Sequence, residues 1–344
     1  MIQSPPPACE IAGCETIHRK ICLILKAAPS RGVDSAPWAQ KVRMKKEPLA
    51  YHAVVHALEA KAGWSMERRF ALSIFHAIHG HLPYSRYHAA GRERAREGIG
   101  EAGVERLVRD FLITDINPAI SFISALRSPS AALGAFNAYN ASADLGVRTK
   151  VADVETRESA CSGTARLSAS RSMLTQADDP APCRTATLSV MGQLLDHVAF
   201  GGQSLYRPRS LSELAELLGR GRSAAADVAR ALEDDWLAPI SKLPSRLGCQ
   251  RRALERRLRE EGLSVGSLRQ AGRMMRATAG LFSGDSVTEI ALDCGFSDAA
   301  HMSRAFRHAC GMTPTMLIQF ARQDAINAGG QPRLPYRRPH ACYP

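Results

Sequence analysis

Arginine is concentrated in one short segment near the C-terminus. Residues 251–259, RRALERRLR, hold five arginines. At about 100° per residue along a helix, the two leucines fall on one side of this segment, and Arg252, Arg256 and Arg259 fall on the opposite side. The planar guanidinium can donate two hydrogen bonds to O6 and N7 of guanine, and it also neutralises phosphate groups. The segment is therefore a candidate helix for contact with nucleic acid.

A second segment repeats this pattern further along the chain. Met302 and Phe306 take the places of the two leucines, and Arg304 and Arg307 take the places of two of the arginines. An isolated arginine-rich helix is usually an ordinary solvated face whose charges pair with neighbouring glutamates. Two copies in the same register favour a binding function instead.

The segments that must position these helices share one sequence pattern. Three segments begin near a serine and end at a glycine, as the first helix of a helix-turn-helix does. They are SLSELAELLG (210–219), ISKLPSRLG (240–248) and SVTEIALDCG (286–295). The arginine-bearing segments follow the second and third. The first is followed by few basic residues, so we expect residues 225–236 to open the C-terminal domain rather than to read DNA.

Composition agrees with a polyanionic partner. The 344 residues carry a formal net charge of +12 and have a pI near 9.5. After residue 240 there are 16 Lys and Arg against 8 Asp and Glu, so the excess is concentrated there. The hydrophobic share of 45% is that of a globular protein. The longest apolar run, Ile21 to Leu25, is too short to span a bilayer.

Periodicity along the chain predicts a mainly helical protein with a small β component in its N-terminal half. Prolines after Asn117 and Ser128 should separate helices between Val104 and Tyr139. Alternation by two predicts a hairpin with strands near 147–151 and 164–168. Further predictions are helices over 49–80 and 188–200, an exposed charged stretch over 86–97, a loop over 175–183, and helices from Leu211 to Phe320.

At this point the sequence resembles the DNA-binding domain of the AraC/XylS family of bacterial transcription regulators. The most specific stretch is SVTEIALDCGFSDAAHMSRAFRHACGMTP (286–314), and LPSRLGCQRRALERRLREEG (243–262) matches the first motif. The resemblance covers residues 223–322. It implies an all-α, seven-helix domain with two helix-turn-helix motifs, joined by a linker helix over Leu268 to Phe282 that is about 22 Å long.

The resemblance also implies residue roles. Base-reading positions fall at Arg252, Ala253, Glu255 and Arg256 in the first motif and at Ala299, Ala300, His301 and Arg304 in the second. Phosphate contacts are expected at Arg251, Arg257, Arg259 and Arg307. Pro244 and Gln250 depart from the family pattern in the first motif, and Gly272 and Gly280 stand within the linker helix. Each of these glycines should cost up to about 1 kcal/mol relative to alanine.

Histidine and cysteine offer other chemistry. His52, His56 and Glu59 would share one helical face, which fits either a transition-metal site or a solvated polar stripe. Without a full zinc signature we favour the solvated stripe and expect no metal. Cys183 lies in APCR, which is faintly similar to the reactive cysteine of methyl-accepting DNA-repair proteins. A metal-dependent or alkyl-transfer enzyme that carries a DNA-targeting domain is therefore the alternative function.

The sequence as a whole predicts a cytoplasmic, sequence-specific transcription regulator that is not an enzyme and needs no cofactor. Expected partners are double-stranded DNA, RNA polymerase, a small-molecule effector and a second copy of the chain, with no membrane. The expected organisation is a loosely ordered lead-in (1–48), an α+β effector-binding or dimerisation domain (49–220), the DNA-binding domain (221–322) and a flexible tail (323–344).

Overall fold

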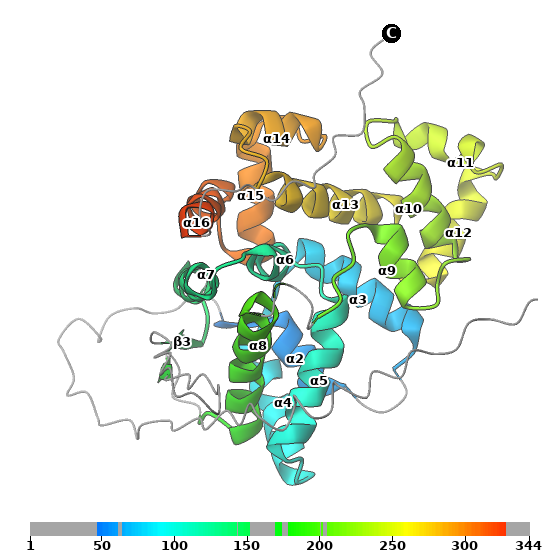
Figure 1. The fold of residues 1–344 in the computed structure, drawn as a ribbon. Coiled ribbons are helices and arrows are strands. Elements are labelled where there is room, and N and C mark those ends of the chain that lie inside the picture. The colour runs from blue at the N-terminus through cyan, green and yellow to red at the C-terminus, as the bar shows by residue number, and fades with distance from the viewer. Residues whose placement is uncertain are drawn as a thin grey trace, which may run out of the picture.

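A computed structural model describes residues 47–60, 64–142, 144–151, 169–173, 178–199, 201 and 205–327. The N-terminal part is mainly helical (Figure 1). Its elements are β1 (Leu49–Tyr51), α2 (His52–Glu59), α3 (Met66–Ile78), β2 (His81–Pro83), α4 (Tyr84–Arg96), α5 (Glu101–Thr114), α6 (Pro118–Ala125), α7 (Pro129–Ser142), β3 (Val147–Val151), β4 (Ala169–Met173) and α8 (Ala181–Ala199).

The C-terminal part is helical throughout its described residues. Its elements are α9 (Leu211–Leu217), α10 (Ala224–Asp234), the short 3-10 helix η2 (Ile240–Lys242), α11 (Leu243–Arg246), α12 (Arg251–Glu260), α13 (Val265–Gly280), α14 (Val287–Asp293), α15 (Ala299–Cys310) and α16 (Pro314–Asn327). Helix α16 thus extends into the segment predicted as a tail. No described helix is both long enough and apolar enough to cross a membrane.

Proline and small polar residues set the helix boundaries that the sequence indicated. Helices α6 and α7 begin at Pro118 and Pro129, where the missing N–H is not needed by the helix. Serine hydroxyls accept hydrogen bonds from the first turns of α9, α10, α13 and α14. The predicted breaks between Val104 and Tyr139 are therefore confirmed.

Several boundaries differ from prediction. Residues 49–51 are a strand that pairs antiparallel with β2, so the first helix begins only at His52. Helix α8 begins at Ala181, because Pro182 is tolerated in a first turn, and the predicted loop is shorter. Residues 86–97 lie mostly in α4, one face of which is buried. The hairpin partner of β3 is β4, and the strand expected at 164–168 lies outside the described residues.

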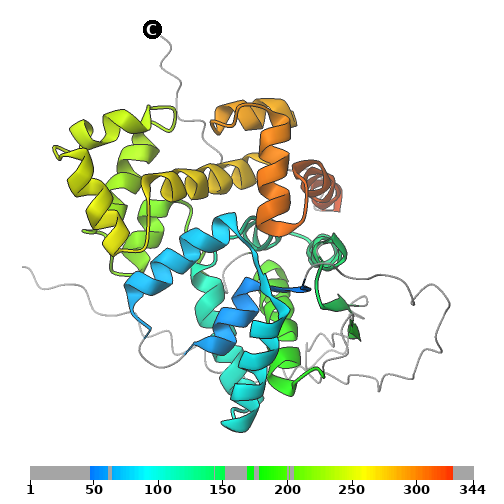
Figure 2. The same cartoon turned by 180° about the vertical axis from the view of Figure 1, so that it is seen from behind.

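Two hydrophobic cores run through the described part of the molecule, and neither is confined to one half of the sequence. The first combines the N-terminal helices with Met274, Phe306 and Leu317 of α13, α15 and α16. The second combines α9 to α12 and the start of α13 with Phe70 and Ile74 of α3. Helix α3 accordingly lies along α13, below it in Figure 1 and again when seen from behind in Figure 2.

Candidate nucleic-acid interface

Helix α12 has the two faces that its sequence predicted. Leu254 and Leu258 are buried in the second core. The arginines are all exposed: Arg251, Arg252, Arg256, Arg257 and Arg259. Arg251 donates a hydrogen bond from Nε to Oε1 of Glu255 over 2.7 Å, which leaves the other four arginines with no ion pair to a described side chain. The exposed face of α12 is therefore strongly cationic.

Helix α15 follows the same plan with fewer charges. Met302 and Phe306 are buried, whereas Ala300, Arg304 and Arg307 are exposed, and Ala299 is half-buried. The backbone N–H of His301 donates to Asp298 over 2.6 Å and so caps the helix. This hydrogen bond is the main cause that lowers the pKa of Asp298.

The side chain of His301 is turned toward the turn that precedes α15. Its Nδ1 lies 3.1 Å from Oγ of Ser297, and its ring packs edge-on against Phe296. The imidazole is half-buried in this position. Reading a base with this side chain would require it to rotate away from Ser297.

A glycine stands at the turn between the helices of each expected motif. Gly248 and Gly295 have φ values of 61° and 76°, a backbone region that favours glycine, and they separate α11 from α12 and α14 from α15. Helix α14 has a complete capping box from Ser286 and Glu289. The first motif is less well capped, because Gln250 makes no side-chain hydrogen bond to the start of α12.

The linker helix α13 contains a glycine whose purpose the sequence did not indicate. A Cβ atom on Gly272 would lie only 1.8 Å from Cη2 of Trp236. The indole of Trp236 therefore packs directly on the helix backbone and joins the second core. The conformational cost of this glycine is offset by close packing between α13 and the loop that precedes η2.

Three arginines of α13 were not among the predicted site residues. Arg269, Arg273 and Arg276 follow the i, i+4, i+7 spacing of one helical stripe, a signal that the sequence does contain. Arg269 donates to the carbonyl oxygen of Trp236 over 3.1 Å, and the guanidinium of Arg276 lies over the ring of the same residue. These side chains add positive charge to α13, which follows α12 and precedes α14 and α15 in the sequence.

The polar stripe expected on the first helix is buried rather than solvated. His52 and His56 are 0% and 4% exposed, so that expectation was wrong. Both rings pack against His76, a residue of α3. The sequence pattern of α2 could not reveal this, because the side chains that contact its histidines come from elsewhere in the chain: His76 in α3, Arg86 in α4 and Asp115 after α5.

Cys183 is also fully buried. Its thiol donates a weak hydrogen bond to the carbonyl oxygen of Tyr87, and burial is the main cause that raises its pKa to about 12. A thiolate is the nucleophilic form of cysteine. This environment therefore opposes the alkyl-transfer chemistry considered as an alternative.

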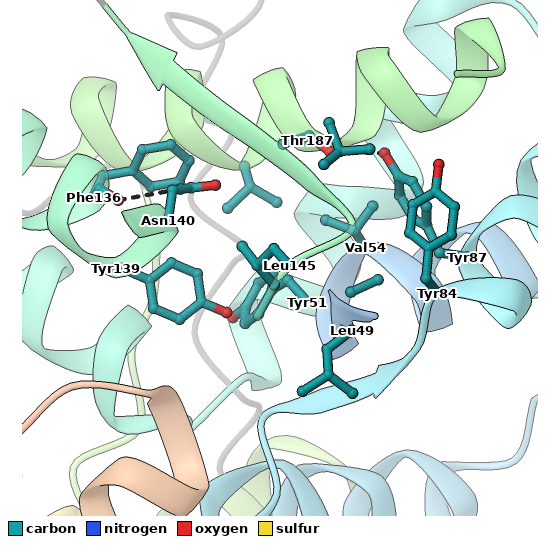
Figure 3. A pocket seen from close by; sticks show the side chains of 13 residues that line it. Leu49, Tyr51, Val54, Tyr84, Tyr87, Phe136, Tyr139, Asn140, Leu145 and Thr187 are labelled. Carbon is teal, nitrogen blue, oxygen red and sulfur yellow. Dashed lines mark hydrogen bonds between the residues drawn. The ribbon is translucent and has the colours of Figure 1, made fainter. Parts of the chain in front are cut away.

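A small pocket lies among the N-terminal helices. Its walls are mainly aromatic and aliphatic, with Tyr51, Tyr84, Tyr87 and Tyr139 around it (Figure 3). The hydroxyl of Tyr51 donates to Asp115 over 2.5 Å, and that of Tyr87 donates to the carbonyl oxygen of Cys183 over 3.0 Å. These bonds fix two of the rings, so the pocket offers rigid apolar faces.

Comparison with known proteins identifies the C-terminal part. A family model described as a helix-turn-helix domain matches residues 243–319. The HTH-type transcriptional regulator GadX from Escherichia coli O6:H1, like its counterpart from strain O127:H6, is 32% identical to this chain over 91 residues.

That match spans 26% of this chain and 33% of each GadX sequence, so the chain covers about a third of the length of the curated relatives it matches. No solved structure matches the chain. The matched residues contain both arginine-bearing helices and the linker α13. Residues 243–319 of this chain are therefore a helix-turn-helix domain, similar in sequence to part of the GadX regulators.

Proposed function

We propose that the chain is a sequence-specific DNA-binding transcription regulator and not an enzyme. In this proposal the seven helices α10 to α16 form one unit, and its two motifs, α11–α12 and α14–α15, read successive major grooves. The observation that carries it is the matched design of α12 and α15, each with a buried apolar stripe and an exposed arginine face. The family match and the GadX similarity support the same conclusion.

Residue roles follow from position on the two helices. We assign base reading to Arg252, Ala253, Glu255 and Arg256 on α12, and to Ala299, Ala300, His301 and Arg304 on α15. Phosphate contact is assigned to Arg251, Arg257, Arg259 and Arg307. The exposed arginines support these assignments, because a guanidinium can serve either role. Arg251 must leave Glu255 in order to reach a phosphate.

We also propose that the pocket around Tyr51 and Tyr139 receives a small, largely apolar effector. Its aromatic lining supports this, since ligand sites in proteins are mostly apolar with few polar groups. RNA polymerase and a second copy of the chain are the remaining proposed partners, and the cytoplasm is the proposed location. Replacing Val54 by Phe would narrow the pocket and should abolish thermal stabilisation by any effector found by ligand screening.

The test of DNA recognition is selection from a random double-stranded library by the full-length chain. We expect enrichment of a bipartite sequence whose halves lie about one helical turn apart, and an affinity that falls as salt rises. An Arg256→Ala, Arg304→Ala double variant should lose this enrichment. Arg148→Ala, which removes an exposed arginine from β3, is the matched control. Absence of any enriched sequence with the wild-type chain would overturn the proposal.

A further inference from the structure

Three side chains that commonly bind metals meet inside the N-terminal helices. His52 is the first residue of α2, His76 lies in the last turn of α3, and Asp115 directly follows α5. They are 0%, 2% and 2% exposed. One ligand atom from each lies within 4.8 Å of the others. Burying polar or charged side chains costs free energy unless each one forms a hydrogen bond or an ion pair or binds a metal.

His52 is oriented as a metal-bound histidine is. Its Nδ1 lies 2.6 Å from the carbonyl oxygen of Gly80, which can only accept, so Nδ1 carries a hydrogen. Its Nε2 faces Oδ2 of Asp115 at 3.1 Å. A histidine that ligates a metal characteristically donates its other ring N–H to a carbonyl or carboxylate oxygen. A cation with bonds of about 2.0–2.2 Å to nitrogen and oxygen can bridge these two atoms.

The carboxylate of Asp115 is held in a fixed orientation beside the two histidines. Its Oδ1 accepts a hydrogen bond from the backbone N–H of Asn117 over 2.9 Å, and its Oδ2 accepts one from the hydroxyl of Tyr51 over 2.5 Å. Carboxylates that bind metals are commonly oriented by such hydrogen bonds.

A row of further ligand-type side chains leads from the cluster toward the surface. Nδ1 of His56 lies 2.7 Å from Nε2 of His76, and Nε2 of His56 lies 3.7 Å from Oε2 of Glu59. Glu59 is 22% exposed and pairs with Arg86, which is 45% exposed. These contacts connect the buried cluster to the partly exposed Glu59–Arg86 pair.

We propose that His52, His76 and Asp115 form a binding site for one divalent transition-metal ion of the class that prefers imidazole, represented by Zn²⁺. The ion takes the place between Nε2 of His52 and Oδ2 of Asp115, and any proton held there is released to solvent. None of these residues belongs to α12 or α15, so the proposal does not depend on the proposed function. The simpler arrangement to be distinguished is a buried His52–Asp115 ion pair that binds no metal.

The test uses the untagged full-length chain. After treatment with a chelator it is incubated with Zn²⁺, desalted and analysed by plasma mass spectrometry. We expect about one zinc ion per chain for the wild type and an affinity at least about tenfold weaker for Asp115→Asn. His308→Gln is the matched control, because the exposed His79–His308 pair is the place where an adventitious surface ion would bind.

A second variant guards against loss of folding. His76→Cys keeps a ligand of different chemistry, so after loading with Co²⁺ it should add a thiolate-to-cobalt absorption band that the wild type lacks. The proposal is overturned if the wild type retains no zinc, or if Asp115→Asn retains as much zinc as the wild type. It is also overturned if His308→Gln is the only variant that loses zinc, or if folded His76→Cys shows no new absorption band.

Discussion

The side-chain amide of Asn117 donates a hydrogen bond of 2.8 Å to the backbone carbonyl of Ala309, near the C-terminal end of α15. The same amide donates to the carbonyl of His76 in α3, also over 2.8 Å. At the same point a Cβ atom on Gly80 would lie 1.8 Å from the oxygen of Ala309. Helix α15 is thus anchored at one end on the N-terminal helices, while Ala300 near its other end is exposed.

Replacing Asn117 by Ala should loosen this anchor. The change removes the donor to the carbonyl groups of His76 and Ala309. Each buried carbonyl group left without a hydrogen bond costs about 1–3 kcal/mol of folding free energy. We expect faster hydrogen exchange at the amides of residues 305–310, measured by mass spectrometry. Asn137→Ala, which removes two hydrogen bonds to Val151 in β3, is the control and should leave exchange in α15 unchanged. Equal exchange in both variants would refute the anchoring role.

Replacing Gly272 by Ala should destabilise the protein even though alanine is the better helix former. The added methyl group would meet the ring of Trp236, and overpacking of this kind costs about 1–3 kcal/mol. Gly266→Ala in the same helix meets only Oγ of Ser264, at 3.7 Å, and should gain up to about 1 kcal/mol. Denaturant unfolding of both variants measures the difference. A stabilised Gly272→Ala protein would contradict the packing argument.

Arg256 and Arg259 should differ in their effect on DNA binding. Arg256→Ala should cost about 1–3 kcal/mol on the preferred sequence and relax selection at one base pair. Arg259→Ala should weaken binding equally on all sequences and reduce its salt dependence. Fluorescence anisotropy with specific and scrambled duplexes separates these outcomes. If both variants lose the same affinity on every duplex, Arg256 does not read a base.

Acidification should destabilise the fold through buried histidines. Burial lowers the pKa of His81 from 6.5 to about 4 and that of His56 to about 3. The unfolded chain therefore takes up protons first. The free energy of unfolding is therefore unaffected by these histidines above pH 6.5. It decreases as the pH falls from 6.5 toward their pKa values in the folded protein, by at most about 1.4 kcal/mol per pH unit for each group.

His81→Gln removes one of these groups, so the drop in unfolding free energy between pH 7.5 and pH 5 should shrink, by about 2 kcal/mol at most. His301→Gln, at the start of α15, is the control for loss of an imidazole outside the core. Denaturant titrations in the presence of a chelator provide the measurement. An unchanged drop in His81→Gln would show that burial of this ring has little effect on its protonation.

The sequence revealed the parts of the site that depend on local periodicity. The stripes of α12 and α15 were readable because their buried and exposed residues follow one helical repeat, with a glycine turn before each. Helix boundaries at Pro118 and Pro129 were readable for a similar reason, since proline acts on its own turn of the chain.

Long-range packing could not be predicted in the same way. The burial of His52 and His56 depends on His76 in α3 and Asp115 after α5, which come close to α2 only in the folded molecule. The role of Gly272 depends on Trp236, a residue that lies far from it in sequence. In both cases the role of a residue depends on a contact with another part of the chain, which the sequence of its own helix does not contain.

The course of α13 through both cores has a thermodynamic consequence. Leu268 and Ala271 pack in the second core, while Met274 and Ala277 pack in the first. Melting either core would expose one end of this helix and so weaken the other core. We therefore expect the described part of the chain to unfold in a single calorimetric transition, and a fragment that begins at residue 221 to expose apolar surface and associate with itself.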